Sequence, residues 1–280
     1  MEIRKASVQG FCFGVAITVK KAEEAIASRN QVTTLGHVVH NPQMVESLSS
    51  RGLQNAQSVD DVDAGALFVR AHGLPVEVFD KAKNKGLEII DATCPMVTKI
   101  HVQAEKLKAD GYKIVVIGDP AHPEVKGTLS HVPGAWCIQS VDDVAKLPRS
   151  SKVGVVVQST WSGQGFTQIV QALAAKYYEV RAVNTICTDT HNRQDEALRL
   201  AHDVEVMVVV GGKTSANTKH LAELSESHGA RSYHIENASE LQPQWFEGVK
   251  VAGLMSGAST PGWLVDEVEA RMEELSRQPA

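Results

Sequence analysis

The sequence predicts an α/β protein built from three related parts, and two features of the chain support this prediction. Short runs rich in β-branched residues alternate with longer segments of helical periodicity, which is typical of α/β folds. The same order of features also occurs three times along the 280 residues. The alternation alone would also allow a single doubly wound sheet, so the repeat is what favours three parts.

The β-branched runs predict six strands, and helical periodicity predicts seven helices. The strands are expected at Leu67–Val69, Glu88–Ile90, Lys113–Ile117, Val153–Val157, Glu205–Val210 and Lys250–Leu254. The helices are expected at Val15–Ser28, Pro42–Ser49, Met96–Ala109, Thr167–Lys176, Arg193–His202, Ala216–Ser227 and Trp263–Leu275. The last helix carries Leu264, Val265, Val268 and Met272 on one stripe, which predicts that this face packs against a core.

Each part contains an extended stretch, one cysteine and a helical pattern. The three cysteines are Cys12, Cys94 and Cys187. A second polar loop stands 28 residues after each cysteine, at His40, His122 and Ser215. A third polar loop follows in each part, with His72, Ser159 and Ser259. The fragment SVDDV occurs at 58–62 and 140–144, both times 46 residues after a cysteine, and is expected to be a solvated helix start.

This repeat predicts three domains, with approximate boundaries at 1–93, 94–186 and 187–280. In parallel α/β units the polar loops collect at the carboxyl ends of the strands, where ligands bind. Three domains related by a pseudo-threefold axis, in a trefoil, would bring the three cysteines to one central point. The polar residues expected around that point are His40, His72, His122, Ser159, Ser215, Asn217 and Ser259.

The composition argues against several classes of function. Lys plus Arg total 28 and Asp plus Glu total 33, so the net charge is −5, and aromatic residues make up 5% of the chain. A nucleic-acid binder normally has a concentrated basic face and aromatic side chains for stacking. The N-terminus lacks the apolar core of a signal peptide, and the longest apolar run, Val206–Val210, is too short to span a bilayer. We therefore expect a cytoplasmic protein with no nucleic-acid or membrane partner.

Each of the three repeated cysteines precedes a predicted helix, whose N-terminus favours a thiolate over a thiol. Buried structural cysteines are common, but three cysteines in equivalent loops favour a shared role. Three thiolates could hold zinc together with a histidine, or an iron–sulfur cluster with one iron left open. The spacing does not distinguish these metals. Cys137 lies outside the repeat, and packing is the expected explanation for it.

Two loops have a composition that is typical of anion-binding sites. GGKTSANT (211–218) and SGASTPG (256–262) open helices with backbone N–H groups and hydroxyl side chains, which is the composition of phosphate sites. The first imitates a Walker A motif, but Met207 stands where that motif requires glycine. Helix capping by Ser and Thr is the alternative explanation. With three histidines nearby, these loops could bind a diphosphate without magnesium.

Glu124, in the segment AHPEV, is expected in the first turn of a helix, where the helix dipole favours a carboxylate. Beside His122 and the hydroxyl of Ser159, it could also act as a general acid.

Taken together, these motifs resemble one enzyme family. GFCFGV, VVHNPQMVESL, RAHGLP, DATCPMVTKIH, HPEVKGT, CTDTHNRQDEA, GGKTSANT and SGASTPGWLVDEV are similar to segments of 4-hydroxy-3-methylbut-2-enyl diphosphate reductases. These enzymes catalyse the last step of the non-mevalonate isoprenoid pathway. The resemblance extends from Cys12 to about Val268, and it implies a trefoil of three α/β domains around a central [4Fe–4S] cluster.

The resemblance also implies a role for each site residue. Cys12, Cys94 and Cys187 would hold three irons of the cluster and leave the fourth iron open. The substrate would be bound by His40, His72, His122, Ser159, Thr160, Ser215, Ala216 through its backbone N–H, Asn217 and Ser259. Glu124 would be the catalytic proton donor, linked through Ser159 to the substrate alcohol. The implied reaction is a reductive dehydroxylation that gives isopentenyl and dimethylallyl diphosphate, with ferredoxin or flavodoxin as the electron donor.

The chain departs from the family pattern in several places, among them Ser159 in place of threonine, His37 and His191, and two of the changes bear on the expected pocket. Ala216 replaces a residue that is usually serine, and Trp161 stands where the family usually has leucine. These changes suggest an alternative, a divergent paralogue that senses a cluster or a prenyl diphosphate without turnover. The intact Glu124 argues against it, because a binding protein needs no proton donor. A zinc hydrolase is the third possibility.

Overall fold

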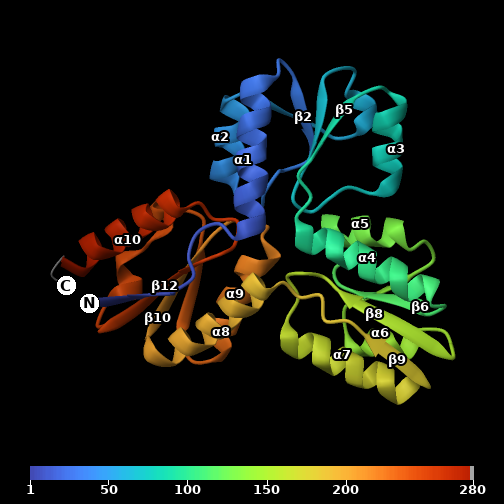
Figure 1. The fold of residues 1–280 in the computed structure, drawn as a ribbon. Coiled ribbons are helices and arrows are strands. Elements are labelled where there is room, and N and C mark those ends of the chain that lie inside the picture. The colour runs from blue at the N-terminus through green and yellow to red at the C-terminus, as the bar shows by residue number, and fades with distance from the viewer. Residues whose placement is uncertain (278–280) are drawn as a thin grey trace. The chain divides into compact units, whose positions relative to one another are not determined.

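The computed structural model describes residues 1–277, and these contain three four-stranded sheets in which all strand pairs are parallel (Figure 1). One sheet has the order β3-β2-β4-β5, with β2 at Val32–Leu35, β3 at Leu53–Ala56, β4 at Ala66–Val69 and β5 at Glu88–Asp91. Its part of the chain includes helices α1 (Phe13–Ser28), α2 (Pro42–Ser50) and α3 (Val76–Asn84).

The second sheet has the order β7-β6-β8-β9. Its strands are β6 (Lys113–Ile117), β7 (Trp136–Ile138), β8 (Lys152–Val157) and β9 (Glu179–Ala182). The helices in this part are α4 (Pro95–Ala109), α5 (Pro123–His131), α6 (Val141–Lys146) and α7 (Gly163–Lys176).

The third sheet has the order β1-β12-β10-β11. Its strands are β1 (Glu2–Lys5), β10 (Val206–Val210), β11 (Arg231–Ile235) and β12 (Val251–Ser256). The helices are α8 (Thr188–Asp203), α9 (Ala216–Ser227) and α10 (Gly262–Arg277), and 3₁₀ turns at Ala238–Glu240 and Pro243–Phe246 lie between β11 and β12. A further 3₁₀ turn, Val59–Asp61, lies between β3 and β4.

The three sheets have the same topology when each is followed from the edge strand that leads to a cysteine. The orders are then β5-β4-β2-β3, β9-β8-β6-β7 and β1-β12-β10-β11. The last part of the chain supplies only three strands, so the N-terminal strand β1 occupies the fourth position beside β12. The predicted repeat is therefore present in the strand order.

The chain forms two compact units. Unit 1 contains Met1–Ala16, Val39–Leu48 and the chain from Thr188 onward, and unit 2 contains Ile17–Val38 and Ser49–Cys187. Strand β1 falls in the range predicted for the first domain, yet it pairs with β12 in unit 1. The division into three domains at 93 and 186 remains a prediction.

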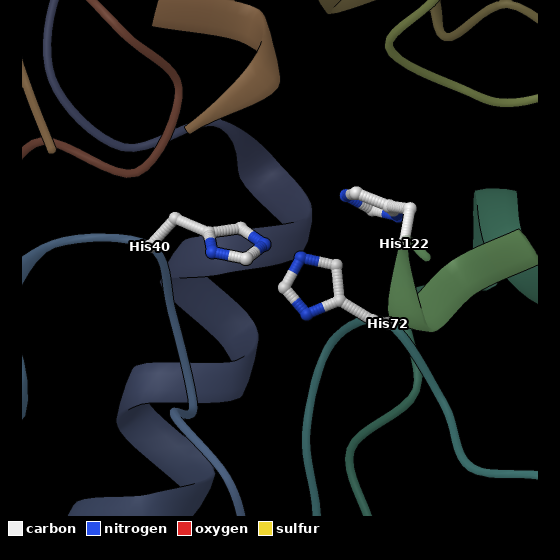
Figure 2. A group of neighbouring side chains, drawn as sticks. All are labelled: His40, His72 and His122. Atoms are coloured by element: carbon white, nitrogen blue, oxygen red, sulfur yellow. The ribbon is translucent and has the colours of Figure 1, made fainter. Parts of the chain in front are cut away.

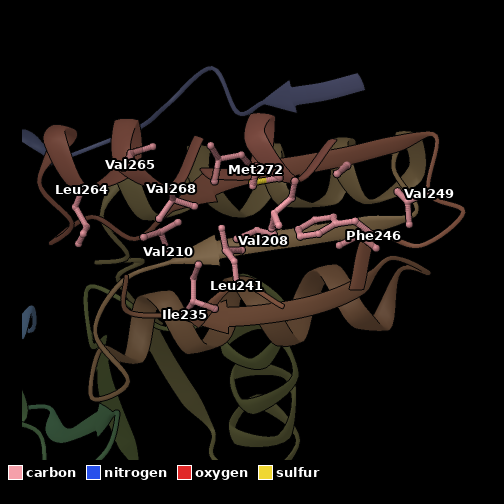
Figure 3. Close-up of a cluster of buried hydrophobic side chains, with 14 residues drawn as sticks. Val208, Val210, Ile235, Leu241, Phe246, Val249, Leu264, Val265, Val268 and Met272 are labelled. Atoms are coloured by element: carbon pink, nitrogen blue, oxygen red, sulfur yellow. The ribbon is translucent and has the colours of Figure 1, made fainter. Parts of the chain in front are cut away.

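The core of unit 1 lies on both faces of its sheet. The predicted stripe of α10 packs on Val206, Val208, Val210 and Leu254 (Figure 3). The alternate residues Met207, Val209 and Met255 pack with α8 and α9 instead, as expected when successive side chains of a strand point to opposite faces. Burial of each such side chain contributes about 1.5–3 kcal/mol. This packing fixes the carboxyl ends of β10 and β12, where two of the predicted binding loops begin.

The structure also contains elements that periodicity did not predict. Strands β1, β2, β3, β7, β9 and β11 and helix α3 were not among the expected strands and helices, and helices α5 and α6 were expected only at their first turns, at Glu124 and in the second SVDDV fragment. The six strands span three to five residues, too few for a periodic pattern to stand out. Within residues 1–277, no helix is both long enough and apolar enough to cross a bilayer.

Candidate active site

The three repeated cysteines occupy equivalent positions. Each follows an edge strand, and each backbone N–H donates a hydrogen bond to the loop after the neighbouring strand. The acceptors are the carbonyl oxygen of Ala258 for Cys12, at 3.0 Å, of Ala71 for Cys94, at 2.9 Å, and of Ser159 for Cys187, at 2.9 Å. These loops are the ones predicted to contribute Ser259, His72 and Ser159. The sheet topology thus brings each cysteine loop against one predicted binding loop.

All three cysteines precede a helix, as predicted. Cys12 precedes α1, Cys94 is the N-cap of α4 and Cys187 precedes α8. Within the described residues no cysteine forms a disulfide, and each of these three is partly exposed. The three thiols are therefore chemically available as metal ligands.

At Cys94 the helix N-terminus favours the thiolate, as predicted, but burial outweighs this effect. Burial raises the pKa of the Cys94 thiol, and the backbone N–H groups of Met96 and Val97 offset this only in part. Cys187 and Glu124 raise this pKa further, which places all three groups within electrostatic range of one another. In the absence of a cation, loss of hydration outweighs the helix N-terminus. A bound metal would reverse this balance, because a coordinating thiol is deprotonated.

Glu124 and Ser159 form a closed pair within unit 2. Only 2% of Glu124 is exposed, and Oε1 accepts from the backbone N–H of Ser159 at 2.6 Å. Oε2 accepts from the Ser159 hydroxyl, also at 2.6 Å. Burial raises the pKa of Glu124, while both bonds from Ser159 act in the opposite direction. A carboxyl group in this setting holds a proton at a higher pH than an exposed glutamate does, and can release it.

His122 and His72 lie close together in unit 2. Nδ1 of His122, the N-cap of α5, accepts from the backbone N–H of Glu124 at 3.2 Å. This hydrogen bond requires an unprotonated Nδ1, so Nε2 carries the proton of the neutral ring. The two rings meet edge to face with centroids 5.4 Å apart, and both side chains are drawn in Figure 2. His40, also drawn there, belongs to unit 1.

In unit 1, the loops after β10 and β12 meet His40. The hydroxyl of Ser259 donates to the carbonyl oxygen of His40 at 3.3 Å. A Cβ at Gly212 would collide with that same carbonyl, so the backbone approaches closely only because residue 212 is glycine. Ser215 caps α9, since its Oγ accepts from the backbone N–H of Thr218 at 3.2 Å. Ser215 therefore has the helix-capping role that was the alternative explanation for this loop. The same loop also borders His40.

Two amide side chains complete this part of the site. Asn217, in the first turn of α9, is 5% exposed, and neither its Oδ1 nor its Nδ2 has a hydrogen-bond partner among the described residues. Asn41, which we did not predict, is 1% exposed. Its Oδ1 caps α2 by accepting from Met44 N–H at 2.9 Å. The pair Asn41-Pro42 was the available signal, because Asn and then Pro favour a helix start.

The remaining predicted positions are also placed by the structure. Thr160 Oγ1 accepts from the side-chain amide of Gln158 at 2.9 Å. Ala216 is exposed at the start of α9. Cys137 lies on β7, where its thiol donates to the carbonyl oxygen of Gly118 at 3.3 Å and burial raises its pKa to about 11. It remains a thiol at neutral pH, in agreement with a packing role.

Comparison with known proteins extends these observations over the whole chain. A family model described as LytB protein matches residues 3–273. The chain belongs to the LytB family. Two LytB relatives described as 4-hydroxy-3-methylbut-2-enyl diphosphate reductase are 42% identical (Geotalea daltonii) and 39% identical (Aquifex aeolicus). The alignments cover 99% of both chains in the first case, and 98% of this chain and 97% of the relative in the second.

Two solved structures confirm the fold class of this LytB chain. One, of (E)-4-hydroxy-3-methyl-but-2-enyl diphosphate reductase, has a TM-score of 0.74 at 38% identity and covers 98% of this chain and 100% of that one. The other is of E-1-hydroxy-2-methyl-but-2-enyl-4-diphosphate reductase from Plasmodium falciparum. It has a TM-score of 0.93 at 29% identity, and the match covers 99% of this chain and 89% of that one. The predicted family and the predicted threefold α/β fold are both confirmed.

Proposed function

We propose that this LytB protein is a 4-hydroxy-3-methylbut-2-enyl diphosphate reductase. The substrate takes up two electrons and two protons, loses its allylic hydroxyl as water, and becomes isopentenyl or dimethylallyl diphosphate. Relatives with this description align over 97% or more of both chains. The observation that carries the proposal is the buried Glu124–Ser159 pair, which is a proton donor in a loop cluster that also contains two of the repeated cysteines.

The cofactor that we propose is a [4Fe–4S] cluster held by Cys12, Cys94 and Cys187. The donor set fits this group, because three thiols stand at equivalent positions and none of them is in a disulfide. The fourth thiol, of Cys137, instead donates a hydrogen bond to the carbonyl oxygen of Gly118. Clusters of this kind are held by cysteine thiolates. When bound, the cluster would supply electrons one at a time, and its fourth iron would be a Lewis acid.

Glu124 would deliver the proton that allows the hydroxyl to leave as water. Hydroxide is a poor leaving group, and protonation by a positioned side chain typically accelerates such steps by about 10²–10⁴-fold. The Ser159 hydroxyl, which donates to Glu124 Oε2, would link the carboxyl group to the substrate alcohol. The raised pKa of Glu124 supports this role, because a donor must still hold its proton near neutral pH.

Thr160, beside Ser159, is proposed to contribute to binding of the substrate diphosphate. The other proposed ligands of the diphosphate are His40, His72, His122, Ser215, the backbone N–H of Ala216, Asn217 and Ser259. The start of α9 supports this assignment, since unpaired N–H groups and the helix dipole attract anions. The open amide of Asn217 supports it further, because a buried amide without a partner is costly unless a ligand pairs with it.

The physiological setting of this activity is also part of the proposal. Ferredoxin or flavodoxin would supply the electrons, and the enzyme would act in the cytoplasm. Neither a nucleic acid nor a membrane is proposed as a partner.

An anaerobic reduction assay tests the reaction. Purified protein with a reconstituted cluster receives 4-hydroxy-3-methylbut-2-enyl diphosphate and a low-potential one-electron donor, and chromatography measures the five-carbon products. We expect turnover in the unaltered protein and in Cys137→Ser, the matched thiol control. Glu124→Gln should keep its iron and its affinity for the substrate while losing about 10²-fold or more of kcat. Cys12→Ser should lose iron as well as turnover.

The same experiment separates the alternatives. A complete cluster with tight substrate binding but no product would overturn the proposed reductase activity. The protein would then be a sensor without turnover, an alternative that none of the relatives supports. Stoichiometric zinc in place of iron and sulfide, in protein purified without air, would overturn the cluster assignment.

A further inference from the structure

Arg193 is a fully buried arginine that has no role in the proposed mechanism. It lies on α8 and is 1% exposed. Its Nε donates to Oδ2 of Asp189 at 2.7 Å, one helical turn earlier. Arginine is almost never fully buried unless it is paired, and a single carboxylate could be paired on the surface at a lower desolvation cost. The remaining guanidinium contacts therefore need an explanation.

Those contacts reach two separate loops. Nη1 donates to the carbonyl oxygen of Ser256 at 2.9 Å, and Nη2 donates to the carbonyl oxygen of Gly10 at 2.9 Å. Gly10 lies two residues before Cys12, and Ser256 lies three residues before Ser259. One planar guanidinium thus contacts both the loop of Cys12, a predicted cluster ligand, and the loop of Ser259, which is predicted to bind the diphosphate.

The two loops are also bonded directly to each other. The backbone N–H of Gly10 donates to Oγ of Ser256 at 2.9 Å, and that of Cys12 donates to the carbonyl of Ala258 at 3.0 Å. Gly10 has a φ of +72°, a conformation that favours glycine. Arg193 therefore adds a further link, which bridges the carbonyl oxygens of Gly10 and Ser256, to two loops that already share direct hydrogen bonds.

We propose that Arg193 is a positioning residue that fixes the Cys12 loop against the Ser259 loop and so holds the Cys12 thiol in place for the metal centre. This inference rests on the proposed function for the identity of that centre. Arginine suits the role because its fork donates in one plane to several acceptors at once, whereas lysine is a point donor on a flexible stem. Asp189 orients the fork by accepting from Nε and, at 3.5 Å, from Nη2.

The test compares Arg193→Lys with Arg199→Lys, a control on the same helix whose side chain is exposed and paired with Glu196. Hydrogen exchange of the metal-free protein is measured at residues 8–13 and 255–260. We expect exchange in both loops to accelerate by about tenfold or more in Arg193→Lys, with no change in Arg199→Lys or at residues 113–117 of unit 2. Iron and sulfide per chain after reconstitution should fall at least twofold in Arg193→Lys only, with an altered electron paramagnetic resonance line shape.

Two further variants make the result decisive. Arg193→Ala supplemented with millimolar guanidinium should regain slow exchange and iron uptake, which would not follow if the arginine served only general stability. If Arg193→Lys does not fold, Asp189→Asn is compared instead and should accelerate exchange in the same two loops to a smaller extent.

Unchanged exchange at both loops in a folded variant would overturn the positioning role. Failure of the unaltered protein to take up iron would overturn the proposed cofactor instead. In that case the exchange comparison still decides whether Arg193 holds the two loops.

Discussion

Two buried titratable residues of unit 2 show how burial shifts a pKa towards the uncharged form. Glu124 has a hydroxyl and an amide as partners rather than a cation, so loss of hydration raises its pKa. His101, on α4, is 7% exposed and stacks on His131 with ring centroids 4.2 Å apart. Burial, and secondarily His131, lowers the pKa of His101 to about 4. Both residues favour their uncharged forms, as desolvation requires.

The shift at His101 predicts an acid-sensitive stability. Because its folded pKa lies below that of an unfolded histidine, near 6.5, the stabilisation is present above pH 6.5 and is lost as the pH falls towards 4. We expect this residue to account for a loss of about 3 kcal/mol over that interval. Urea unfolding from pH 4 to 7 measures it, with His101→Gln showing a flatter dependence than the unaltered protein.

The control for this prediction is His202→Gln, at an exposed position of α8. Its stability should follow that of the unaltered protein at every pH. Parallel curves for His101→Gln and the unaltered protein would show that burial of His101 has no such effect.

At the scale of elements, the repeated fragment SVDDV forms the same cap twice. Ser58 caps the 3₁₀ turn Val59–Asp61 and Ser140 caps α6. In both, the serine side chain and the aspartate three residues later exchange hydrogen bonds with each other's backbone N–H, which is a capping box with aspartate. The expectation of a solvated helix start is met at both places, because the fragment contains the whole local motif.

Removal of either cap should therefore have a small and similar cost. We expect Ser58→Ala and Ser140→Ala each to lower the free energy of unfolding by about 1 kcal/mol. Chemical denaturation measures both against Ser227→Ala. Its exposed hydroxyl bonds back to Leu224 and meets Nδ1 of the adjacent His228, and its removal should change stability by less than about 0.5 kcal/mol. A cost at Ser140 no greater than at Ser227 would contradict the capping role.

At the scale of the whole chain, the N-terminal strand completes the last sheet. β1 pairs along its length with β12, from Glu2 beside Val251 to Lys5 beside Leu254. The first two sheets each take the edge strand that leads to a repeated cysteine from the same stretch of chain as their other strands. The third sheet takes it from the opposite end of the sequence, so unit 1 depends on both ends of the chain.

Deletion of residues 1–5 should consequently loosen unit 1 alone. We expect hydrogen exchange of β12 and β10 to accelerate because the edge of β12 loses its partner strand, while β6 and β8 in unit 2 keep their protection. Mass spectrometry of the corresponding peptides measures this. Equal acceleration in both units would show that the strand supports the whole chain rather than its own sheet.

Much of this protein is determined by local sequence. The threefold repeat, the cysteine before each helix, the long helices and the stripe on α10 all follow from spacing and periodicity, and the motifs sufficed to predict the family. The helices, the stripe and each cysteine motif can be predicted because each depends on residues close together in the chain, and the repeat can be predicted because the same spacing recurs three times. The predicted roles of the site residues remain part of the proposal, although the structure places Glu124 against Ser159, and Ser259 against the backbone of His40.

Other features were decided only by the tertiary structure. The pairing of β1 with β12, the raised pKa of Cys94, the buried amide of Asn41 and the three-way contact of Arg193 could not be read from spacing. A strand joins whichever sheet edge the rest of the chain leaves open, and that edge is set by residues about 250 positions away. The cost of removing a thiol or a guanidinium from water likewise depends on every neighbour that surrounds it, and those neighbours come together only when the chain has folded.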